Sequence, residues 1–540
     1  MPPMTHADAQ ARAERDTRTL GRCFLAWARR GPRRIAVVDP RGSLSRIRLA
    51  AVALALEPLL GLAEDEARVG VVLPPGQGGT LVNVALALGG RAAVNLNHTT
   101  GDAQLAQMGR LAGLRTIVSS RVYLERIGNP KLPARVVLAE NLIPRLGKAR
   151  VVWQMVRVLT RSAARLDRAR PEDVAVVVFS SGSTGEPKGV QLTHRQILAN
   201  CDAVVEHLDL RPDVDSVTSP LPLFHAFGVL PGLWLPLVNG CLVASQPDPR
   251  DAVSLGKLAT RARTTFLIST PTFVRTYMRR IAPEQLAHLR LAVVGAERCP
   301  QDLKDAFKAR YGAELLEGYG ATELGPAVSV NRPGHVREGS VGQPLPGVEV
   351  FTMDADTRQI LPPGEPGLIV VRSAACMLGY LDRPDLTARA LVHGGYDTGD
   401  VGRVDADGYV FLTGRLARFA KVGGEMVPLD NVEAALQAWV EARYGEAYDV
   451  AVGAAPSATR GEKLVVMHTG VPEDPEALLG ALADLPPIFR PKRPDFHVVD
   501  AIPTLGTGKR DLGGIRKLAE ALSSGTERTS GVGEVHRHAS

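Results

Sequence analysis

A loop rich in hydroxyl groups and glycines follows a short apolar run in this sequence. The run covers residues 174–179, and the loop, residues 180–189, reads SSGSTGEPKG. Glycines let a backbone fold closely around a phosphate and turn several N–H groups towards it, while hydroxyls and a lysine add further donors. The pattern therefore predicts a phosphate-binding loop. Its candidate ligands are Ser181, Gly182, Ser183, Thr184, Gly185 and Lys188.

The spacing within this loop excludes the P-loop of the common nucleoside triphosphatases. A P-loop has Gly directly before its Lys, and Ser or Thr directly after it. Here Pro187 precedes Lys188 and Gly189 follows it. The loop is therefore expected to serve another kind of phosphate chemistry.

Five further segments combine reactive side chains with glycine or proline. Residues 219–228 read SPLPLFHAFG, 294–297 read VGAE, 317–323 read EGYGATE, 396–400 read YDTGD and 503–509 read PTLGTGK. Taken singly, each has an ordinary interpretation, such as a packed histidine, a surface carboxylate, an acidic turn or a solvated lysine. Only the set, in this order along the chain, is specific.

The set resembles the signatures of the adenylate-forming superfamily, which includes acyl-CoA synthetases, luciferases and peptide-synthetase adenylation domains. Residues 180–189 are similar to its phosphate-binding signature, and residues 503–509 to the segment that carries its catalytic lysine. The resemblance implies that ATP and a carboxylic acid form an acyl-adenylate with release of pyrophosphate. A thiol then displaces AMP.

The resemblance also implies roles for individual residues. Glu323 and Thr184 would hold Mg²⁺, an ion that prefers oxygen ligands beside phosphate. Lys509 would be the catalytic lysine, because a mobile cation lowers the barrier when two anions meet. His225 would close the acyl pocket. The residues implied to line adenine, phosphate or ribose are Gly295, Ala296, Glu297, Tyr319, Gly320, Thr322, Asp400 and Arg415.

A mobile C-terminal domain is implied for the second half-reaction. Its rotation would withdraw Lys509 and present Lys421 and Gly424 to a pantetheine thiol. At the hinge the family usually has Asp or Lys where this chain has Ala417. An exposed charge there would help the backbone to swing in water, and the neighbouring Arg418 is expected to compensate.

Several stretches narrow the resemblance to the ligase part of the bifunctional 2-acylglycerophosphoethanolamine acyltransferase/acyl-acyl-carrier-protein synthetases. They include RVGVVLPP, AVNLNHTTG, LPLFHAFG, LRLAVVGAE and GRLARFAKVGGEMV, and the resemblance covers about residues 20–520. It implies a medium- to long-chain fatty acid and a phosphopantetheine thiol on acyl carrier protein or CoA. The acyltransferase part of those proteins uses His-x₄-Asp, and none of the 12 histidines here has Asp five residues on. Lysophospholipid acyl transfer is therefore not expected.

The scaffold for these segments is predicted to be α/β, in layers with mostly parallel strands. Short β-branched runs alternate with helical patterns, for example at residues 69–73, 116–119, 174–179 and 291–294. After about residue 340, frequent Gly and Pro with short strands predict a β-rich module. We expect an N-terminal adenylation domain over residues 1–413, a small mobile α+β domain over 414–522 and a disordered tail over 523–540.

Composition limits the class of protein. At 540 residues, with 45% hydrophobic and 22% charged residues, the chain is typical of a folded multidomain protein. A net charge of +7 favours acidic partners, but basic blocks interleaved with aromatic residues are absent, so nucleic-acid binding is not expected. Five scattered cysteines fit a reducing cytoplasm. The uncharged stretch 229–245 contains two prolines and is predicted to be buried strand and turn rather than a membrane span.

One basic stretch, residues 145–170, leaves two interpretations open. It has eight Lys or Arg residues and one acid, with Trp153, Met155, Val156 and Leu159 among them. This pattern fits a helix on a membrane surface, which would place the protein peripherally at the inner membrane face. It also fits a connecting helix with a solvated basic face, which is the simpler interpretation.

The sequence as a whole predicts a cytoplasmic, ATP- and Mg²⁺-dependent ligase. It would join a fatty acid to the phosphopantetheine thiol of acyl carrier protein or CoA. Two alternatives stay open. One is an acyl-CoA synthetase for another carboxylic acid, and the other is a non-catalytic protein that binds acyl groups or nucleotide.

Overall fold

A computed structural model describes residues 17–181, 186–422, 425–457, 460–483, 485–504 and 510–524. The chain divides into two compact units by its internal contacts. Unit 1 comprises residues 1–180, 187–398 and 402–412, and unit 2 comprises residues 181–186, 399–401 and 413–540.

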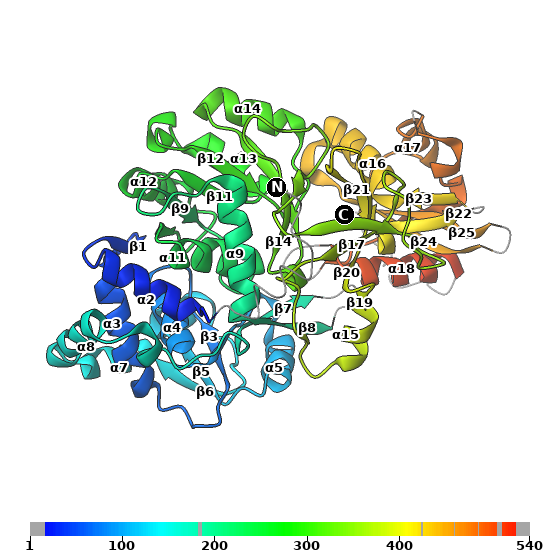
Figure 1. The fold of residues 1–540 in the computed structure, drawn as a ribbon. Helices are drawn as coiled ribbons and strands as arrows, with labels where there is room; N and C mark the ends of the chain where they lie inside the picture. Colours follow the sequence, from blue (N-terminus) through cyan, green and yellow to red (C-terminus); the bar gives the residue numbers. More distant parts are fainter. Residues whose placement is uncertain are drawn as a thin grey trace, which may run out of the picture. The chain divides into compact units, whose positions relative to one another are not determined.

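A nine-stranded sheet forms one layer of unit 1 (Figure 1). In spatial order its strands are β15 (Gln343–Pro344), β14 (Ala327–Val330), β13 (Leu315–Gly320), β12 (Leu291–Val294), β11 (Phe266–Ser269), β9 (Ser216–Ser219), β10 (Leu242–Ser245), β1 (Ile35–Asp39) and β2 (Gly42–Ser45). The strands from β13 to β1 on this path run parallel, and antiparallel strands flank them on both sides. Parallel strands need helices on both faces, and both faces are covered.

The two faces of this sheet belong to different hydrophobic clusters because side chains alternate along a strand. Leu267 and Val294 pack with α12 (Ala252–Ala262), α13 (Pro271–Arg280) and α14 (Gln301–Tyr311). Ile268 and Val293 face the main core, to which α9 (His194–Leu208) contributes. The predicted α/β layering is confirmed by this arrangement.

A second, seven-stranded sheet in unit 1 carries the predicted phosphate loop. Its spatial order is β18 (Gly379–Tyr380), β8 (Pro187–Thr193), β7 (Val174–Ser181), β4 (Ala92–Asn95), β3 (Arg68–Val72), β5 (Thr116–Ser119) and β6 (Arg135–Leu138). The five strands from β7 to β6 run parallel. The predicted loop thus joins β7 to β8, and β8 leads into α9.

Helices of the first 170 residues, and one after β18, complete unit 1. They are α2 (Leu20–Arg30), α3 (Arg46–Leu56), α4 (Gln77–Leu88), α5 (Asp102–Leu111), α6 (Arg121–Arg126), α7 (Ala139–Leu142), α8 (Lys148–Thr160) and α15 (Pro384–Ala390). Within the residues that the structure describes, no helix is both long and apolar enough to cross a membrane.

The prediction of strand and turn for residues 229–245 is wrong in its first half. This part is helical: α10 (Ala226–Val229), the π-helix η5 (Leu230–Trp234) and α11 (Leu235–Val238) follow one another, and only β10 is a strand. Two prolines occupy the first turns of η5 and α11, where a missing N–H costs little. The side chains on all sides of these turns are buried, so no helical periodicity is visible in the sequence.

The β-rich module predicted after residue 340 is confirmed. Its sheet runs β16 (Glu349–Met353), β17 (Gly367–Arg372), β20 (Gly395–Val404) and β19 (Leu391–Val392), and β21 (Val410–Arg415) pairs with β20. The pairs β16–β17 and β19–β20 are antiparallel. This module places the segment with Tyr396 and Asp400 on one long strand, β20.

Unit 2 is a five-stranded sheet with helices on both faces (Figure 1). The strands are β22 (Phe419–Val422), β23 (Glu425–Pro428), β24 (Val450–Ser457), β25 (Gly461–His468) and β26 (Phe496–Val498). Val452 and Val466 pack with α16 (Leu429–Tyr444) on one face, where α17 (Pro475–Gly480) also lies. Ala451 and Val465 pack with α18 (Leu512–Ser524) on the other.

Candidate active site

Three of the predicted segments lie at the carboxyl ends of parallel strands of the nine-stranded sheet. The segment with His225 follows β9, the segment with Gly295 follows β12, and Tyr319 lies at the end of β13. Parallel strands bring their carboxyl ends to one edge, and ligands of α/β proteins bind at such edges. The topology therefore gathers these segments at one edge of the sheet.

Close backbone contacts at this edge require glycine. A methyl group on Gly295 would lie 3.2 Å from the Gly318 carbonyl oxygen and 3.7 Å from the Phe227 ring. A methyl group on Gly320 would lie 2.1 Å from the Pro326 carbonyl oxygen, far inside contact distance. Any side chain at Gly320 would therefore displace the loop that carries Tyr319 and the following residues.

The loop after β12 is strained and anchored at the same time. Ala296 adopts a positive φ of 67°, a conformation that costs a non-glycine residue free energy and is frequent at functional sites. The carboxylate of Glu297 accepts hydrogen bonds from the Thr272 backbone N–H, at 3.2 Å, and from its hydroxyl, at 2.6 Å. This carboxylate therefore holds the start of α13.

The carboxylate of Glu323 lies buried in a cluster with two tyrosines. The Tyr380 hydroxyl donates to Glu323 Oε1 at 2.8 Å and lies 3.3 Å from the Tyr396 hydroxyl. The Glu323 carbonyl oxygen accepts from the Met377 N–H at 2.7 Å. Burial and the neighbouring Glu323 charge raise the pKa of Tyr380 and of Tyr396, so both hydroxyls keep the proton with which they donate. The cluster thus fixes where this carboxylate points.

Tyr380 also links Glu323 to the phosphate loop. The ammonium group of Lys188, on β8, lies 5.5 Å from the centroid of the Tyr380 ring, within cation–π range. Lys188, which is predicted to bind phosphate, and Glu323, which is predicted to hold Mg²⁺, therefore contact one tyrosine. Sequence reasoning missed Tyr380. Its Gly-Tyr setting carries no charge or motif pattern that marks it, and only strand β18 beside β8 brings it here.

The donor set at Glu323 fits Mg²⁺. Within the described ranges, no group of three or more His, Cys, Asp or Glu side chains could hold a metal by itself. Mg²⁺ at nucleotide sites needs only one or two carboxylates, with phosphate oxygens and water as its other ligands. A single buried carboxylate near a phosphate-loop lysine meets that need. Thr322, on the adjoining turn η7 (Thr322–Leu324), is half-buried.

The predicted ribose ligands Asp400 and Arg415 lie together in unit 2. Asp400 Oδ1 lies 3.0 Å from Arg415 Nε, and Asp400 is buried while Arg415 is largely exposed. A carboxylate that is oriented by a guanidinium has lone pairs in fixed directions. The pair can therefore present a positioned acceptor to two adjacent hydroxyl groups.

The expectation that Arg418 compensates for Ala417 with a solvent-exposed charge is wrong. Arg418 is 4% exposed. Its guanidinium binds Asp430 Oδ1 and Glu433 Oε2, both at 2.6 Å, and donates to the Val452 carbonyl oxygen. Although burial opposes its charge, these two carboxylates raise the pKa of Arg418. This arginine therefore anchors the chain after β21 to unit 2.

The residues of unit 2 that are predicted to face the pantetheine thiol, Lys421 and Gly424, are only partly described. Lys421 lies exposed on β22, and its backbone N–H donates to Glu462 Oε2 at 2.6 Å. Six predicted residues lie outside the described ranges, namely Gly182, Ser183, Thr184, Gly185, Gly424 and Lys509. Of Ser181, only the backbone at the end of β7 is described.

An aromatic group adjoins the predicted acyl gate. His225 is exposed, and its ring lies 4.7 Å from that of Phe224. On its other side, Phe224 meets the His98 ring edge-on at 5.3 Å, and the Tyr123 hydroxyl lies 3.3 Å from His98 Nε2. Burial lowers the pKa of His98. The sequence marked His98 only as part of the AVNLNHTTG resemblance, and gave Tyr123 no mark at all.

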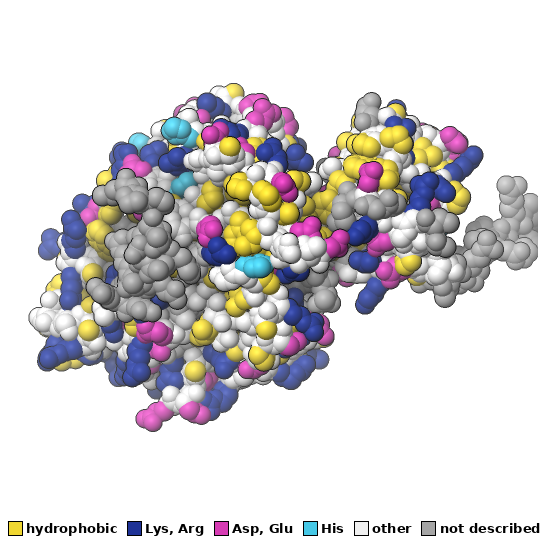
Figure 2. Space-filling view, turned by 45° about the vertical axis from the view of Figure 1, so that its right-hand side comes forward, with side chains coloured by type: hydrophobic (Ala, Val, Ile, Leu, Met, Phe, Trp, Pro, Cys, Tyr) yellow, Lys and Arg dark blue, Asp and Glu magenta, His cyan; other side chains and the backbone are white. Residues whose placement is uncertain are grey.

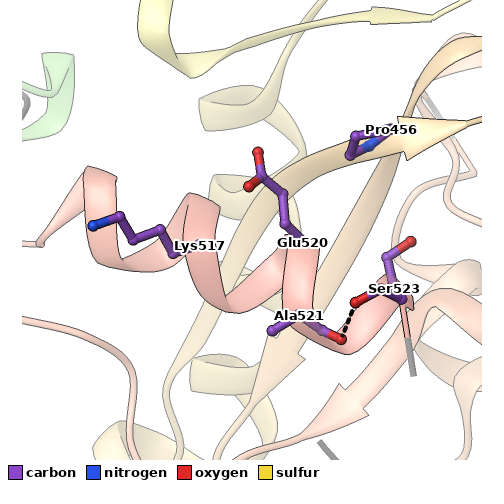
Figure 3. A pocket seen from close by; sticks show the side chains of 6 residues that line it. Pro456, Lys517, Glu520, Ala521 and Ser523 are labelled. Atoms are coloured by element: carbon purple, nitrogen blue, oxygen red, sulfur yellow. Dashed lines mark hydrogen bonds between the residues drawn. The ribbon is translucent and has the colours of Figure 1, made fainter. Parts of the chain in front are cut away.

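A surface hollow in unit 2 contains no predicted site residue. Beside α18, it is lined by Pro456, Lys517, Glu520, Ala521, Ser523 and Ser524, with the Ser524 hydroxyl bonded to the Ala521 carbonyl oxygen (Figure 3). Its lining lacks the glycine-rich backbone that a phosphate site needs. This hollow plays no part in the site.

Replacement of Tyr380 by Phe tests its role in positioning Glu323. Loss of the 2.8 Å hydrogen bond should raise KM for Mg·ATP about 10-fold, which is the usual effect of removing a residue that hydrogen-bonds to a metal ligand. KM for the carboxylic acid should stay unchanged. Steady-state kinetics with each substrate varied measures both. Tyr277→Phe is the matched control, because the buried Tyr277 hydroxyl also donates a 2.8 Å bond, to the Pro249 carbonyl oxygen. Equal effects of the two changes would contradict the role.

Known proteins share both the sequence and the fold of this chain. Residues 24–381 match the AMP-binding enzyme family. The chain is 30% identical over 412 residues to the 3-hydroxybenzoate–CoA/4-hydroxybenzoate–CoA ligase of Thauera aromatica, covering 74% of this chain and 76% of the relative. It is 29% identical over 350 residues to a long-chain-fatty-acid–CoA ligase of Bacillus subtilis, covering 62% and 60%.

Solved structures extend the likeness of fold to nearly the whole chain. The anthranilate CoA ligase AuaEII in complex with anthranoyl-AMP aligns with a TM-score of 0.74 at 23% identity, over 94% of this chain and 98% of that one. The o-succinylbenzoate CoA synthetase of Bacillus subtilis, in complex with its acyl-adenylate, aligns with a TM-score of 0.76 at 20% identity, over 93% and 98%. The chain therefore belongs to the AMP-binding enzyme family, as an AMP-forming, ATP-dependent ligase of the adenylate-forming superfamily.

Proposed function

We propose that this protein joins a medium- to long-chain fatty acid to the phosphopantetheine thiol of CoA or of holo-acyl carrier protein. The observation that carries the proposal is the linked group of Lys188, Tyr380 and Glu323. It places a phosphate-loop cation and a fixed, buried carboxylate around one ring. Two such groups are what a nucleotide with its magnesium ion requires.

In the first half-reaction, a carboxylate oxygen of the acid attacks the α-phosphorus of ATP. The bond between that phosphorus and the bridging oxygen breaks, and pyrophosphate leaves. Lys188 and the loop before it bind phosphate oxygens, and Asp400 accepts bonds from the ribose hydroxyls. Lys509 balances the charge that builds up as two anions meet. Magnesium, held by Glu323 and Thr184, would supply further charge neutralisation when bound.

In the second half-reaction, the thiolate sulfur attacks the acyl carbon of the adenylate and AMP leaves. We assign residues 414–522 to a mobile domain that rotates between the two steps. The rotation withdraws Lys509 from the adenylate and brings Lys421 and the loop at Gly424 to it. The backbone at Gly424 would let a pantetheine arm pass closely, since no side chain stands in its way. Enclosure of the adenylate during the exchange limits its hydrolysis.

A fatty acid is the proposed substrate for two reasons. Relatives of this chain from Bacillus subtilis and Escherichia coli are long-chain-fatty-acid–CoA ligases, at 29% and 31% identity. The stretches AVNLNHTTG and LPLFHAFG, which resemble the acyl-carrier-protein synthetases, supply the contacting rings of His98 and Phe224 beside His225. Other relatives are a hydroxybenzoate–CoA ligase and a feruloyl-CoA synthase. Aromatic acids are therefore the substrates with which fatty acids should be compared.

The acceptor is tested by offering CoA and holo-acyl carrier protein side by side. The enzyme is supplied with ATP, Mg²⁺ and saturated acids of increasing chain length, with 4-hydroxybenzoate and ferulate beside them. Thioester formation on either thiol is followed by mass spectrometry. The proposal expects kcat/KM to be at least about 10-fold higher for the best fatty acid than for either aromatic acid, because each buried methylene adds to binding. A preference for an aromatic acid would contradict the proposed substrate, and no thioester on either thiol would contradict the proposed acceptors.

A further inference from the structure

One helix of unit 1, α8, has an uncovered apolar face. It lies beside α3 and α2 (Figure 1). Gln154 and Val158 are its buried residues, and the Arg29 side chain of α2 donates to the Val158 carbonyl oxygen at 2.7 Å. This face fixes the helix to the protein, and the opposite face has no covering element among the described residues.

The uncovered face carries a stripe of large apolar side chains. Val152, Trp153, Val156 and Leu159 are 57%, 60%, 44% and 54% exposed. Their spacing places them along one side of an α-helix. Ile143, just before the helix, is 65% exposed. Single exposed apolar residues are ordinary on a protein surface, but five within seventeen residues form a patch.

The charged side chains of α8 and of the turns on either side of it are all positive. Arg145, Lys148, Arg150, Arg161 and Arg165 are exposed, and Arg157 is half-buried. From residue 141 to residue 166 the chain has no Asp or Glu. The next acid, Asp167, is buried and contacts Arg22 and Thr19. Figure 2 shows that Lys and Arg are elsewhere interspersed with Asp and Glu on much of the face drawn.

The apolar stripe and its basic border together indicate what binds to this face of α8. In a symmetric dimer the same patch meets itself, so two rows of positive charge would face each other and repel. A bilayer with anionic headgroups offers an apolar interior to Trp153 and its neighbours, and negative charge to the basic border. Since no described helix is suited to cross a membrane, α8 would lie on the surface.

We infer that α8 docks this protein on an anionic lipid surface, with Trp153 and Val156 inserted between headgroups. Of the two interpretations of residues 145–170, this one is favoured by the exposure of the apolar stripe in the structure. Docking follows from the exposed face of one helix and does not depend on the ligase reaction. Binding is therefore tested without any substrate.

The test is co-sedimentation of the full chain with two kinds of vesicle. One kind is phosphatidylcholine alone, and the other is equimolar phosphatidylcholine and phosphatidylglycerol. The wild type is expected to bind the anionic vesicles at least about 10-fold more tightly than the neutral ones, and less tightly as salt rises. The double variant W153S/V156S and the triple variant R145E/K148E/R150E should each weaken anionic binding about 10-fold or more.

Matched controls separate docking from a general change of surface. V214S/V253S removes two exposed apolar side chains elsewhere, and R279E/R280E reverses two exposed charges on α13. Both should bind anionic vesicles as the wild type does. Trp153→Phe keeps an apolar ring and should therefore still bind anionic vesicles. Tryptophan fluorescence of the wild type should shift to the blue when vesicles are added, and Trp153→Phe should lack the part of this shift that arises from Trp153.

Three outcomes would overturn the inference. The wild type could fail to bind anionic vesicles, or the α8 variants could bind them as well as the controls do. In the third, analytical ultracentrifugation without lipid would show that the wild type is a dimer and that W153S/V156S is a monomer. That result would make this face an interface between two copies of the protein. Circular dichroism melting of each variant shows that it is folded, so that lost binding is not lost structure.

Discussion

Replacement of Glu323 by Gln is expected to lower the rate of acyl-adenylate formation by about 100- to 1,000-fold, the usual loss when one group that stabilises transition-state charge is removed. Gln keeps the shape of the side chain and an acceptor for the Tyr380 hydroxyl, so the cluster should stay folded. It lacks the charge that Mg²⁺ requires. Pyrophosphate exchange into ATP, measured over a series of Mg²⁺ concentrations, reports the loss. The Mg²⁺ concentration for half-maximal rate should rise with it.

Glu314→Gln provides the control. Glu314 stands nine residues before Glu323 and is partly exposed, with contacts to Lys308 and to the Gly334 N–H. Its replacement also removes one negative charge, but it should leave both the rate and the Mg²⁺ dependence unchanged. If Glu323→Gln kept wild-type Mg²⁺ dependence, the assignment of Glu323 as a metal ligand would be wrong.

Replacement of Lys509 by Ala is expected to lower adenylate formation by about 1,000-fold, while ATP still binds. The lysine acts on charge that develops in the transition state, and a group of that kind changes rate much more than ground-state affinity. Single-turnover formation of the acyl-adenylate measures the rate, and binding of a non-hydrolysable ATP analogue measures the affinity. Lys517→Ala, which removes an exposed lysine from α18, should change neither.

The two half-reactions also separate in this variant. When fatty acyl-adenylate is supplied directly with the thiol, Lys509→Ala should form thioester at a rate close to that of the wild type, since Lys509 is assigned to the first step only. Lys421→Ala should show the reverse pattern. If Lys509→Ala slowed adenylate formation and thioester formation equally, the proposed rotation of the C-terminal domain between the two steps would be contradicted.

The sequence could predict the site segments because each segment carries its own local chemistry. Glycines, hydroxyls and a lysine mark the loop at 180–189 without any knowledge of the fold. Gly320 is a further case, since the backbone contact that excludes any side chain there is with Pro326, only six residues further along the chain. The apolar spacing of Ile197, Cys201 and Val204 in the sequence likewise indicates helix α9.

What the sequence did not reveal depends on contacts between distant segments. Tyr380 reaches Glu323 from 57 residues away, through the pairing of β18 with β8. Arg418 was expected to supply the exposed charge that the hinge lacks at Ala417, but Asp430 and Glu433 on α16 pair with it and stabilise its charge in the interior. The helical turns at 226–238 were missed because burial on all sides leaves no periodicity to detect.

The central claim, that this protein activates a fatty acid as its adenylate, is tested most directly by the products of ATP. The purified protein is incubated with ATP and Mg²⁺, with and without each acid of the panel, and pyrophosphate, orthophosphate and AMP are measured. We predict pyrophosphate that appears only when a fatty acid is present, with AMP released in equal amount once the thiol is added. Pyrophosphate that no acid stimulates, or cleavage of ATP to ADP and orthophosphate, would contradict the account.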